Sequence, residues 1–558
     1  MADYQSKLVV VKAAPKDDAD GAEPQPAAPV DAVKKSRRKP RRNLTANDMA
    51  KQQREISISE FFTKNRHLLG FDNPRRALLT TVKEAVDNSL DACEEAGILP
   101  EVSVTIKQTT SEERFRITVT DNGPGIVKKQ IPRVFGKLLY GSKFHRLKMS
   151  RGQQGIGISA AGMYGHLTTG HPVCVTSRIA PKQPAHYYEI VINTSNNEPK
   201  ILKEETVDWD MPQGTRVEIE LEGIYQRGLW SVDEYLEQTA TANPHVSLRY
   251  EAPDGQKMVL PRATDVLPDE PREIKPHPHG IELGTLITIL HETRAHTLAG
   301  CLQLEFCRVS KRTAQEICQR AGLHENARPR RIAQNEADKL LKALRDTKLM
   351  NPPMDCVCPI GKDLIEAGMR KHFEADFYAA VTRTPTVYRG IPFVIEAGVA
   401  YGGDMKEGTP AKLMRFANRV PLLYNTGACV TKQAVCDLNW RQYGVDQPSG
   451  ALPTGPLLIL VHVASPWVPF TSESKEAVAS YPAIEKEITL AVQECARGLR
   501  RFIHGNRRRA EERRKREYIE KYIPHIGEAL QEILKLSDVR REKVVASLTD
   551  VLEHSRAG

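Results

Sequence analysis

The sequence predicts an α+β protein of several domains, and three observations support this prediction. The chain has 558 residues, which is enough for more than one hydrophobic core. A helical pattern over 75–97 is followed by two short apolar segments, VSVTI and FRITVT, which are typical of strands. Proline-rich segments at 267–280 and 351–359 then separate a helical region, 281–350, from a second strand-rich region, 385–465.

The composition is that of a globular protein without a membrane segment. Hydrophobic residues make up 40% of the chain and charged residues 27%. The longest apolar run, GPLLILVHVA at 455–464, is too short to span a bilayer, so we expect it to form a buried strand. The first residues lack the basic-then-apolar order of a secretory signal. We therefore expect a cytoplasmic protein with no membrane contact.

Two basic segments favour nucleic acid as a partner. The formal net charge is +10, and the densest basic stretches are KKSRRKPRR (34–42) and RRFIHGNRRRAEERRKRE (500–517). Neither has a strong apolar face beside its charge, which favours nucleic acid over a membrane surface. A solvated arm is the alternative for each stretch. In a bacterium or archaeon, a protein that binds nucleic acid in this way would be associated with the nucleoid.

The cysteines do not indicate a metal site. Ten cysteines are scattered along the chain without a CxxC pair. Cys356 and Cys358 form a lone CxC with no second pair and no histidine cluster, so zinc is not expected. We expect reduced, mostly buried thiols.

The helix predicted over 75–97 carries a line of polar residues. At about 100° per residue, Glu84, Asn88 and Asp91 fall within roughly 60° of one another. The apolar residues occupy a different side of the helix: Leu78, Val82, Val86 and Leu90. The polar line is either the wet face of an amphipathic helix or a carboxylate and an amide that hold a water and a metal. Gly97 is the expected C-terminal cap.

Two glycine-containing segments follow the helix. In DNGPGI (121–126), Asp121 ends a predicted strand, so its carboxylate is expected to point into a cleft, and Gly123 and Gly125 would let a flat ligand approach. A hairpin turn is the alternative for this segment. The segment RGQQGIGISAAGMYG (151–165) places three glycines before a helical run, which exposes backbone N–H groups to phosphates. Taken alone, each segment is weak evidence of a nucleotide site.

The order of these elements is more informative than any one of them. A helix with Glu84 and Asn88, a strand ending at Asp121, a glycine-rich loop and GTRVEI at 214–219 together resemble the GHKL ATPase superfamily. This superfamily includes gyrase, an ATP-dependent chaperone family, histidine kinases and mismatch-repair ATPases. LLYGSKFH (138–145), GQQGIGISAAGMYG and VPFTSESKEAVA (468–479) are similar to the B subunits of type IIB topoisomerases, the topoisomerase VI family. The likeness runs from about residue 50 to beyond 500.

The resemblance implies a role for each site residue. Glu84 would be the general base, and Asn88 would ligate Mg²⁺. Asp121 would accept a hydrogen bond from the adenine amine of ATP, supported by Thr215 through a water. Lys475, from a second domain, would reach the γ-phosphate, with Lys432 as a less favoured candidate. The phosphates would be wrapped by Ser142, Lys143 and a lid made of Gly152, Gln153, Gln154, Gly155, Ile156, Gly157, Ile158 and Ser159.

The resemblance also implies a domain order. A disordered basic tail (1–50) would precede a GHKL (Bergerat) ATPase sandwich (51–272). A helix-two-turn-helix insert (273–352) would follow. A transducer with a ribosomal-S5-like fold and a long helix (353–535) and a C-terminal tail (536–558) would complete the chain.

The implied function is that of an ATP-hydrolysing topoisomerase subunit. Its partners would be an A subunit in an A2B2 heterotetramer, a second copy of itself on ATP binding, and double-stranded DNA. A chaperone, a histidine kinase, a mismatch-repair ATPase and a non-enzymatic DNA-binding scaffold are the alternatives. The basic blocks and the helical insert disfavour a chaperone, and an insert at 280–350 disfavours a mismatch-repair ATPase. No histidine precedes the ATPase region to act as a kinase phosphoacceptor, and an intact Glu84 disfavours a scaffold.

Overall fold

The computed structural model describes residues 46–50, 60, 62, 64–109, 111–143, 146–152, 155–193, 196–472 and 474–554. The chain divides into two units, Met1–Glu55 and Ile56–Gly558. In the first unit the described residues form the short helix α1 (Ala46–Ala50), and the rest of the predicted disordered tail lies outside the described residues. Within the described ranges, none of the helices combines the length and the apolar character that crossing a bilayer requires.

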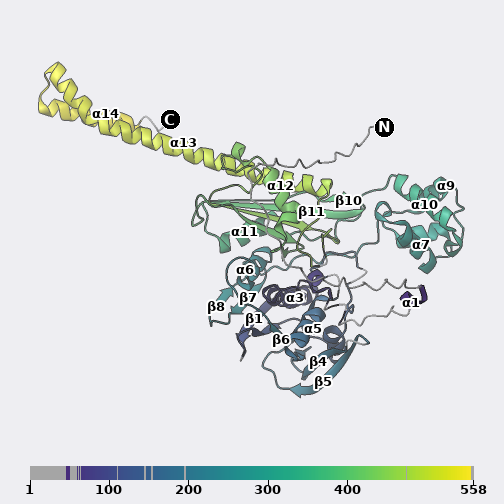
Figure 1. Ribbon diagram of the computed structural model, residues 1–558. Coiled ribbons are helices and arrows are strands. Elements are labelled where there is room, and N and C mark those ends of the chain that lie inside the picture. Colours follow the sequence, from purple (N-terminus) through teal and green to yellow (C-terminus); the bar gives the residue numbers. More distant parts are fainter. Residues whose placement is uncertain are drawn as a thin grey trace, which may run out of the picture. The chain divides into compact units, whose positions relative to one another are not determined.

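An eight-stranded sheet forms the first layer of the second unit (Figure 1). Its strand order is β5-β4-β3-β6-β2-β1-β7-β8, and β1 and β7 are its parallel neighbours. Helices α3, α5 and α6 pack on it. The strands are β1 (Glu101–Gln108), β2 (Arg114–Asp121), β3 (Val173–Arg178), β4 (Ala185–Asn193), β5 (Glu198–Val207), β6 (Gly214–Glu222), β7 (Ser247–Glu251) and β8 (Lys257–Leu260). The helices are α3 (Pro74–Glu95), α4 (Ile131–Gly136), α5 (Gly157–Thr169) and α6 (Val232–Ala242).

The predicted hairpin of VSVTI and FRITVT is confirmed by strands β1 and β2. They pair antiparallel, with Val102 opposite Asp121 and Ile106 opposite Ile117. Alternate residues of each strand are buried, because successive side chains of a strand point to opposite faces of the sheet. This alternation is the signal from which the sequence predicted both strands.

Helix α3 has the boundaries and the buried face that the sequence predicted. The Asn73 side chain accepts a hydrogen bond from the Arg76 backbone N–H (2.8 Å), and Pro74 occupies the first turn, where no N–H is needed. The helix ends just before Gly97, whose φ of +68° is the left-handed conformation of a terminating glycine. Its four predicted apolar residues are at most 2% exposed: Leu78, Val82, Val86 and Leu90.

Four helices with their own apolar core form an insert that follows the first sheet and precedes the second along the chain, as predicted for 281–350. Two of these helices begin with a hydroxyl cap: Thr297 accepts from the Gly300 N–H, and Ser310 from the Thr313 N–H. The helices are α7 (Leu283–Glu292), α8 (Leu298–Glu305), α9 (Lys311–Ala321) and α10 (Gln334–Asp346).

Both ends of the insert are bonded to the segment that precedes the glycine-rich loop. The Ile274 N–H donates to the Leu147 carbonyl (3.2 Å), and the Met149 N–H donates to the Cys356 carbonyl (2.9 Å). The Cys358 N–H lies 3.4 Å from the Met149 sulfur. The two ends of the insert therefore lie close together, beside the glycine-rich loop.

A second sheet, with strand order β10-β11-β14-β12-β13 and with β9 also paired to β11, follows the insert. Strand β14 pairs antiparallel with β11 and parallel with β12, and all of its residues are buried. The predicted buried strand at 455–464 is thereby confirmed. The elements are α11 (Lys362–His372), β9 (Phe377–Thr382), β10 (Thr386–Tyr388), β11 (Ile391–Tyr401), β12 (Lys412–Ala417), β13 (Val420–Pro421), α12 (Val430–Asp437) and β14 (Leu457–Ala464).

A 53-residue helix, α13 (Pro482–Leu534), packs on strands β9 and β11 and confirms the long helix predicted from 483 to about 535. The residues of the predicted apolar stripe are all buried: Ile488, Val492, Cys495, Leu499 and Ile503. The region expected as a C-terminal tail contains helix α14 (Asp538–His554), which packs back on α13.

The ten cysteines are all free thiols, and seven of them are buried. The prediction of mostly buried thiols is confirmed. Desolvation by burial raises the pKa of Cys495 to about 12, so this thiol stays protonated in the interface between α13 and the second sheet.

We expect Leu499→Ala to lower the free energy of unfolding of the second sheet domain by about 2–5 kcal/mol, because it leaves a cavity under α13. Leu499 is fully buried, whereas Leu534 on the same helix is 60% exposed, so Leu534→Ala is the matched control. Thermal and denaturant unfolding followed by circular dichroism measure both variants. Equal losses in the two would contradict the packing of α13 on the sheet.

Candidate active site

A cavity of about 350 Å³ lies where the first sheet domain meets the second. One side consists of α3, the end of β2, the 141–143 loop, the glycine-rich loop and β6. Residues 421–424 and 474–476 of the second domain line the other side. The cavity brings together residues that are far apart in the sequence.

Asp121 is the last residue of β2, and it lines the cavity as predicted. Its Oδ2 accepts a hydrogen bond from Ser89 Oγ (2.8 Å), and its Oδ1 accepts from the backbone N–H groups of Gly123 (2.9 Å) and Thr215 (3.2 Å). Desolvation by burial raises the pKa of Asp121 above its ordinary value, although these hydrogen bonds oppose the rise. Since each carboxylate oxygen has two acceptor positions, Oδ2 retains one for a ligand N–H.

The two glycines after Asp121 are required by the packing of the protein itself. Gly125 lines the cavity with a φ of +69°, and a Cβ on it would lie 2.2 Å from the Arg178 carbonyl oxygen. A Cβ on Gly123 would lie 2.9 Å from Asp121 Oδ1. Gly123 is not among the lining residues, and its backbone N–H donates to Asp121 Oδ1.

Glu84 and Asn88 lie one turn apart on α3, and both line the cavity. The Glu84 side chain lies against the first residue of α5, because a Cβ on Gly157 would be 1.7 Å from Glu84 Oε2. Asn88 is exposed, and its Oδ1 is 3.7 Å from the position of a Cβ on Gly152. The cavity therefore has a carboxylate and an amide oxygen beside the glycine-rich loop.

The third residue of the predicted polar line is placed differently. Asp91 is 5% exposed and does not line the cavity. Lys143 Nζ lies 2.6 Å from its Oδ2, and Arg151 Nη1 lies 2.9 Å from its Oδ1. Burial would raise the pKa of Asp91, but the charges of Lys143 and Arg151 outweigh it and hold the pKa below its ordinary value.

The glycine-rich loop runs into helix α5, so its backbone N–H groups lie at a helix N-terminus. Five of its predicted residues line the cavity: Gly152, Gly155, Ile156, Gly157 and Ile158. Ser159 is buried, does not line the cavity and donates its hydroxyl to the Ile156 carbonyl (3.0 Å). Gln153 and Gln154 lie outside the described residues. Ser142 and Lys143 line the cavity from the preceding loop.

Lys475 reaches the cavity from the loop after β14. Its Nζ donates to the Arg151 carbonyl (3.3 Å), and its backbone φ is +53°, a conformation that non-glycine residues rarely adopt. Desolvation by burial lowers the pKa of Lys475, and the nearby charge of Glu84 opposes the fall. Lys432 lies on α12 and does not line the cavity.

A second polar contact between the domains lies next to Lys475. Arg76 of α3 forms ion pairs with Asp72 and with Glu476, and Glu476 also accepts a hydrogen bond from the Asn425 amide. The Arg76 guanidinium carbon lies 5.3 Å from the centre of the Tyr424 ring. Helix α3 thus contacts the loop that carries Lys475.

Sequence reasoning missed the roles of four residues in this arrangement: Ser89, Asp91, Arg151 and Glu476. Ser89 and Asp91 lie on the correct helix, and helical geometry could have suggested their contacts. Arg151 begins the glycine-rich segment, but nothing in its local pattern indicates carboxylate partners some sixty residues earlier.

The chain is similar to known proteins over most of its length. Residues 73–223 match the family model of histidine kinase-, DNA gyrase B- and HSP90-like ATPases, and residues 352–516 match that of the topoisomerase VI B subunit transducer. The type 2 DNA topoisomerase 6 B subunit of Methanococcoides burtonii is 50% identical over 518 residues, covering 92% of this chain and 83% of that one. The corresponding protein of Methanosarcina acetivorans is 50% identical (90% and 81% covered), and that of Archaeoglobus fulgidus is 46% identical (91% and 84% covered).

A buried carboxyl on α3 allows a test of these electrostatics. Burial raises the pKa of Asp87 from 3.8 to about 6. The groups that face Asp87 are Lys83 and Glu84 on the same helix, Arg151 before the loop, and Tyr235 of α6, whose hydroxyl donates to Asp87 Oδ1 (2.9 Å). Because the folded pKa is raised, the stability gained from protonated Asp87 is complete below pH 3.8 and is lost as the pH rises through about 6.

We therefore expect Asp87→Asn to gain about 2–2.5 kcal/mol of unfolding free energy relative to wild type between pH 4 and pH 7, at 1.36 kcal/mol per pKa unit. Denaturant unfolding at several pH values measures the difference. Asp265→Asn, at a carboxyl whose side chain is 86% exposed, is the control. A wild-type-minus-variant difference that does not change with pH would contradict the raised pKa.

Proposed function

The chain belongs to the family of topoisomerase VI B subunits, and we propose that its cavity binds ATP with Mg²⁺ and that Glu84 is the general base for hydrolysis. It is the ATPase subunit of a type IIB topoisomerase, and the predicted multidomain α+β fold is confirmed. The family assignment excludes the chaperone, mismatch-repair, kinase and scaffold alternatives. The observation that supports the proposal most is that Glu84, Asn88, Asp121 and Lys475 line one cavity.

The adenine would lie at the Asp121 end of the cavity. Asp121 Oδ2 has an acceptor position left for the exocyclic amine, and the ring would pass over Gly125. Thr215 is within reach of a bridging water, because its backbone N–H already donates to Asp121 and its hydroxyl lies 3.2 Å from Ser177 Oγ. These contacts would select a base that donates hydrogen bonds.

The phosphates would lie along the glycine-rich lid and the start of α5. Backbone N–H groups at a helix N-terminus favour anions, and Ser142 and Lys143 line the cavity beside them. Asn88 fits a magnesium site, since Mg²⁺ prefers oxygen ligands and keeps several waters. When bound, Mg²⁺ would supply charge neutralisation at the phosphate oxygens.

Glu84 would act as the general base. Its carboxylate lies one turn before Asn88 and against Gly157, so a water between Glu84 and the terminal phosphate could lose its proton to Oε2. Hydrolysis then depends on position and charge neutralisation, which the lid and Lys475 would supply.

Lys475 would contact the γ-phosphate and so distinguish ATP from ADP. Desolvation lowers the pKa of its ammonium, which interacts with the charge of Glu84, so an added phosphate charge would stabilise its charged form. Because Lys475 belongs to the second domain, its engagement would couple hydrolysis to domain position.

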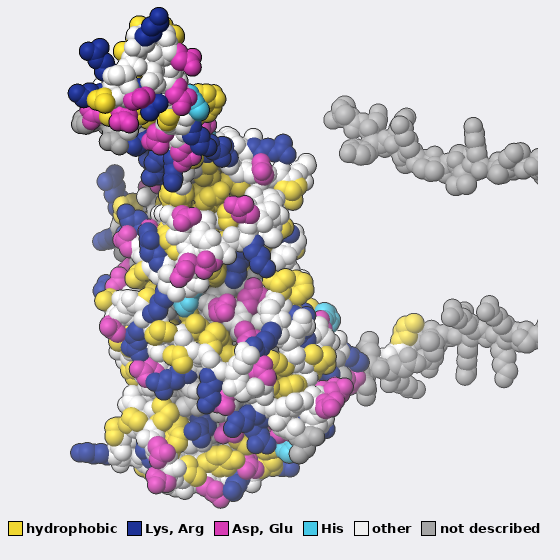
Figure 2. Space-filling view, turned by 90° about the vertical axis from the view of Figure 1, so that its left-hand side faces the viewer, with side chains coloured by type: hydrophobic (Ala, Val, Ile, Leu, Met, Phe, Trp, Pro, Cys, Tyr) yellow, Lys and Arg dark blue, Asp and Glu magenta, His cyan; other side chains and the backbone are white. Residues whose placement is uncertain are grey.

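The remaining chain would transmit this motion to DNA. As a topoisomerase VI B subunit the chain works with an A subunit, and we propose an A2B2 complex in which ATP binding closes two B subunits on a duplex. Figure 2 shows Lys and Arg side chains gathered near the upper part of the molecule, and α13 exposes Arg501, Arg507, Arg508, Arg509, Arg513, Arg514 and Lys515. This charge suits DNA phosphates. Such a protein would act at the nucleoid, in the cytoplasm.

We expect Glu84→Gln to lower DNA-stimulated ATP hydrolysis by about 10²–10⁴-fold, the range for loss of a general base, while ATP binding persists. The measurement is Mg²⁺-dependent turnover of the complex with its A subunit, with and without duplex DNA. Glu112→Gln, at an exposed hairpin position, is the control. Turnover within about threefold of wild type would reject Glu84 as the base.

We expect Lys475→Met to weaken binding of a non-hydrolysable ATP analogue by about tenfold relative to ADP, a coupling within the usual range between sites. It should also abolish the change in domain position on analogue binding, as seen by small-angle scattering. Lys432→Met is the matched control, because Lys432 lies outside the cavity. An unchanged ratio of the two affinities would show that Lys475 does not contact the γ-phosphate.

A further inference from the structure

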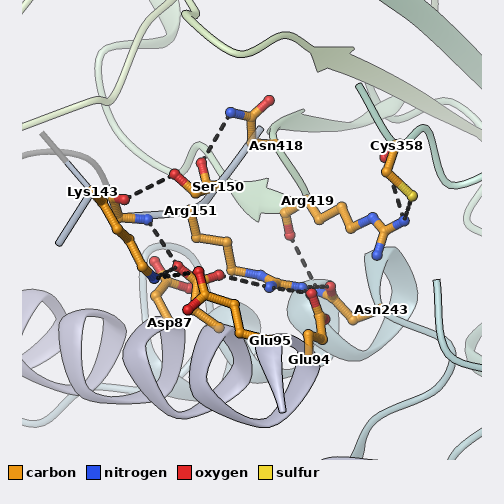
Figure 3. A network of polar contacts seen from close by, with 12 residues as sticks. Asp87, Glu94, Glu95, Lys143, Ser150, Arg151, Asn243, Cys358, Asn418 and Arg419 are labelled. Carbon is orange, nitrogen blue, oxygen red and sulfur yellow. Dashed lines mark hydrogen bonds and ion pairs between the residues drawn. The ribbon is translucent and has the colours of Figure 1, made fainter. Parts of the chain in front are cut away.

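Arg151 lies immediately before the lid, and its buried side chain has several polar partners (Figure 3). The side chain is 4% exposed. Nη1 donates to Asp91 Oδ1 (2.9 Å) and to Glu94 Oε2 (2.8 Å), and Nη2 donates to Glu94 Oε1 (2.6 Å). Nη2 also donates to the Asn243 side-chain oxygen. The guanidinium therefore joins the end of α3 to the residue that follows α6.

The charges around this guanidinium are complementary. Burial would raise the pKa of Glu94, but the charge of Arg151 and a hydrogen bond from His245 (2.7 Å) hold it well below its ordinary value. Both carboxylates that accept from Arg151 are on α3, within the two turns after Asn88. The lid base is thus bonded to the helix that carries Glu84.

The backbone beside this guanidinium is bonded to the second domain. The Arg151 carbonyl accepts from Lys475 Nζ (3.3 Å), and the Ser150 carbonyl accepts from the Asn418 amide (3.1 Å). Asn418 and Arg419 form the turn between β12 and β13, with φ values of +48° and +67°. Asn243, which accepts a hydrogen bond from the Arg151 guanidinium, in turn donates to the Arg419 carbonyl (3.2 Å).

We propose that Arg151 is a positioning residue for ATP hydrolysis, whose guanidinium fixes the base of the lid on α3 so that Lys475 meets the γ-phosphate opposite Glu84. The guanidinium holds in place the residue whose backbone carbonyl accepts from Lys475, and this residue directly precedes the lid. If the fork is lost, that carbonyl and the first lid residue, Gly152, are no longer fixed relative to Glu84. This inference depends on the γ-phosphate role proposed for Lys475.

A lysine cannot reproduce this arrangement. The guanidinium is planar with donors in a fixed fork, and here it bridges Asp91, Glu94 and Asn243 at once. An ammonium keeps the charge but is a single point with three rotatable donors. Arg151→Lys therefore separates the effect of charge from the effect of position.

The test compares Arg151→Met and Arg151→Lys with wild type in the complex with its A subunit. Calorimetry gives the affinities for ADP and for a non-hydrolysable ATP analogue, and steady-state turnover gives kcat and KM. We expect the analogue affinity to fall about tenfold more than the ADP affinity in Arg151→Met, with a smaller shift in Arg151→Lys and a lower kcat in both. Arg116→Met, which removes a partly buried ion pair with Glu220 away from the cavity, is the control.

A double-mutant cycle distinguishes positioning from general stability. If Arg151 acts through Lys475, the loss of analogue preference in Arg151→Met/Lys475→Met will equal that in Lys475→Met alone. Additive losses, or equal losses for ADP and the analogue in Arg151→Met, would overturn the inference. Should Arg151→Met fail to fold, Glu94→Gln keeps the arginine but weakens its bond to α3. The preference for the ATP analogue over ADP must then fall in Glu94→Gln as well.

The outcomes also separate this inference from the proposed function. If Lys475→Met leaves the analogue preference unchanged, the γ-phosphate role of Lys475 is wrong and the inference falls with it. If Lys475→Met removes the preference while Arg151→Met and Glu94→Gln retain it, only the role of Arg151 is overturned.

Discussion

The rest of the structure depends on one constraint, namely which face of helix α3 is buried against the first sheet. Its apolar residues, Leu78, Val82, Val86 and Leu90, are almost fully buried. Burying each contributes about 1.5–3 kcal/mol, so turning the helix would expose several of them at once. With that face fixed, the helical period directs Glu84 and Asn88 into the cavity, and Asp91 and Glu94 toward the base of the lid. The positions of the site and of the ion pairs that support it are thus set by one rigid element.

Much of this could be predicted because the signals are local. Alternating residues indicated β1 and β2, a capped helical period indicated α3, and an apolar run indicated β14. The cavity residues Glu84, Asn88 and Asp121 belong to motifs whose order along the chain identifies the family. Sequence could not supply the partners of Arg151, because an ion pair between distant segments leaves no local period. It also supplied only a family likeness for Lys475, whose burial and left-handed backbone come from tertiary contacts.

The interface between the two sheet domains combines polar and apolar contacts where it meets the cavity, since Leu423 of the second domain packs into the core of the first. Arg76 and Glu476 form an ion pair there, and Asn418 bonds to a backbone carbonyl rather than to an apolar surface. Polar contacts can be exchanged for water at smaller cost than a packed apolar interface. The ends of the helical insert bond to Leu147 and Met149, just before the lid, so movement of the insert would also reach the nucleotide site.

If the second sheet moves as proposed, the long helix α13 would turn a small displacement at the sheet into a larger one at its far end. Its N-terminal half is buried on the second sheet as far as Ile503, so that half must turn with the sheet. From Ile503 to Leu534 it extends roughly 45 Å further, at 1.5 Å per residue. A tilt of roughly 10° at the sheet would therefore sweep the far end through roughly 8 Å, given that length. If ATP hydrolysis tilts the second sheet as proposed, the length of α13 beyond that sheet determines how far its far end moves.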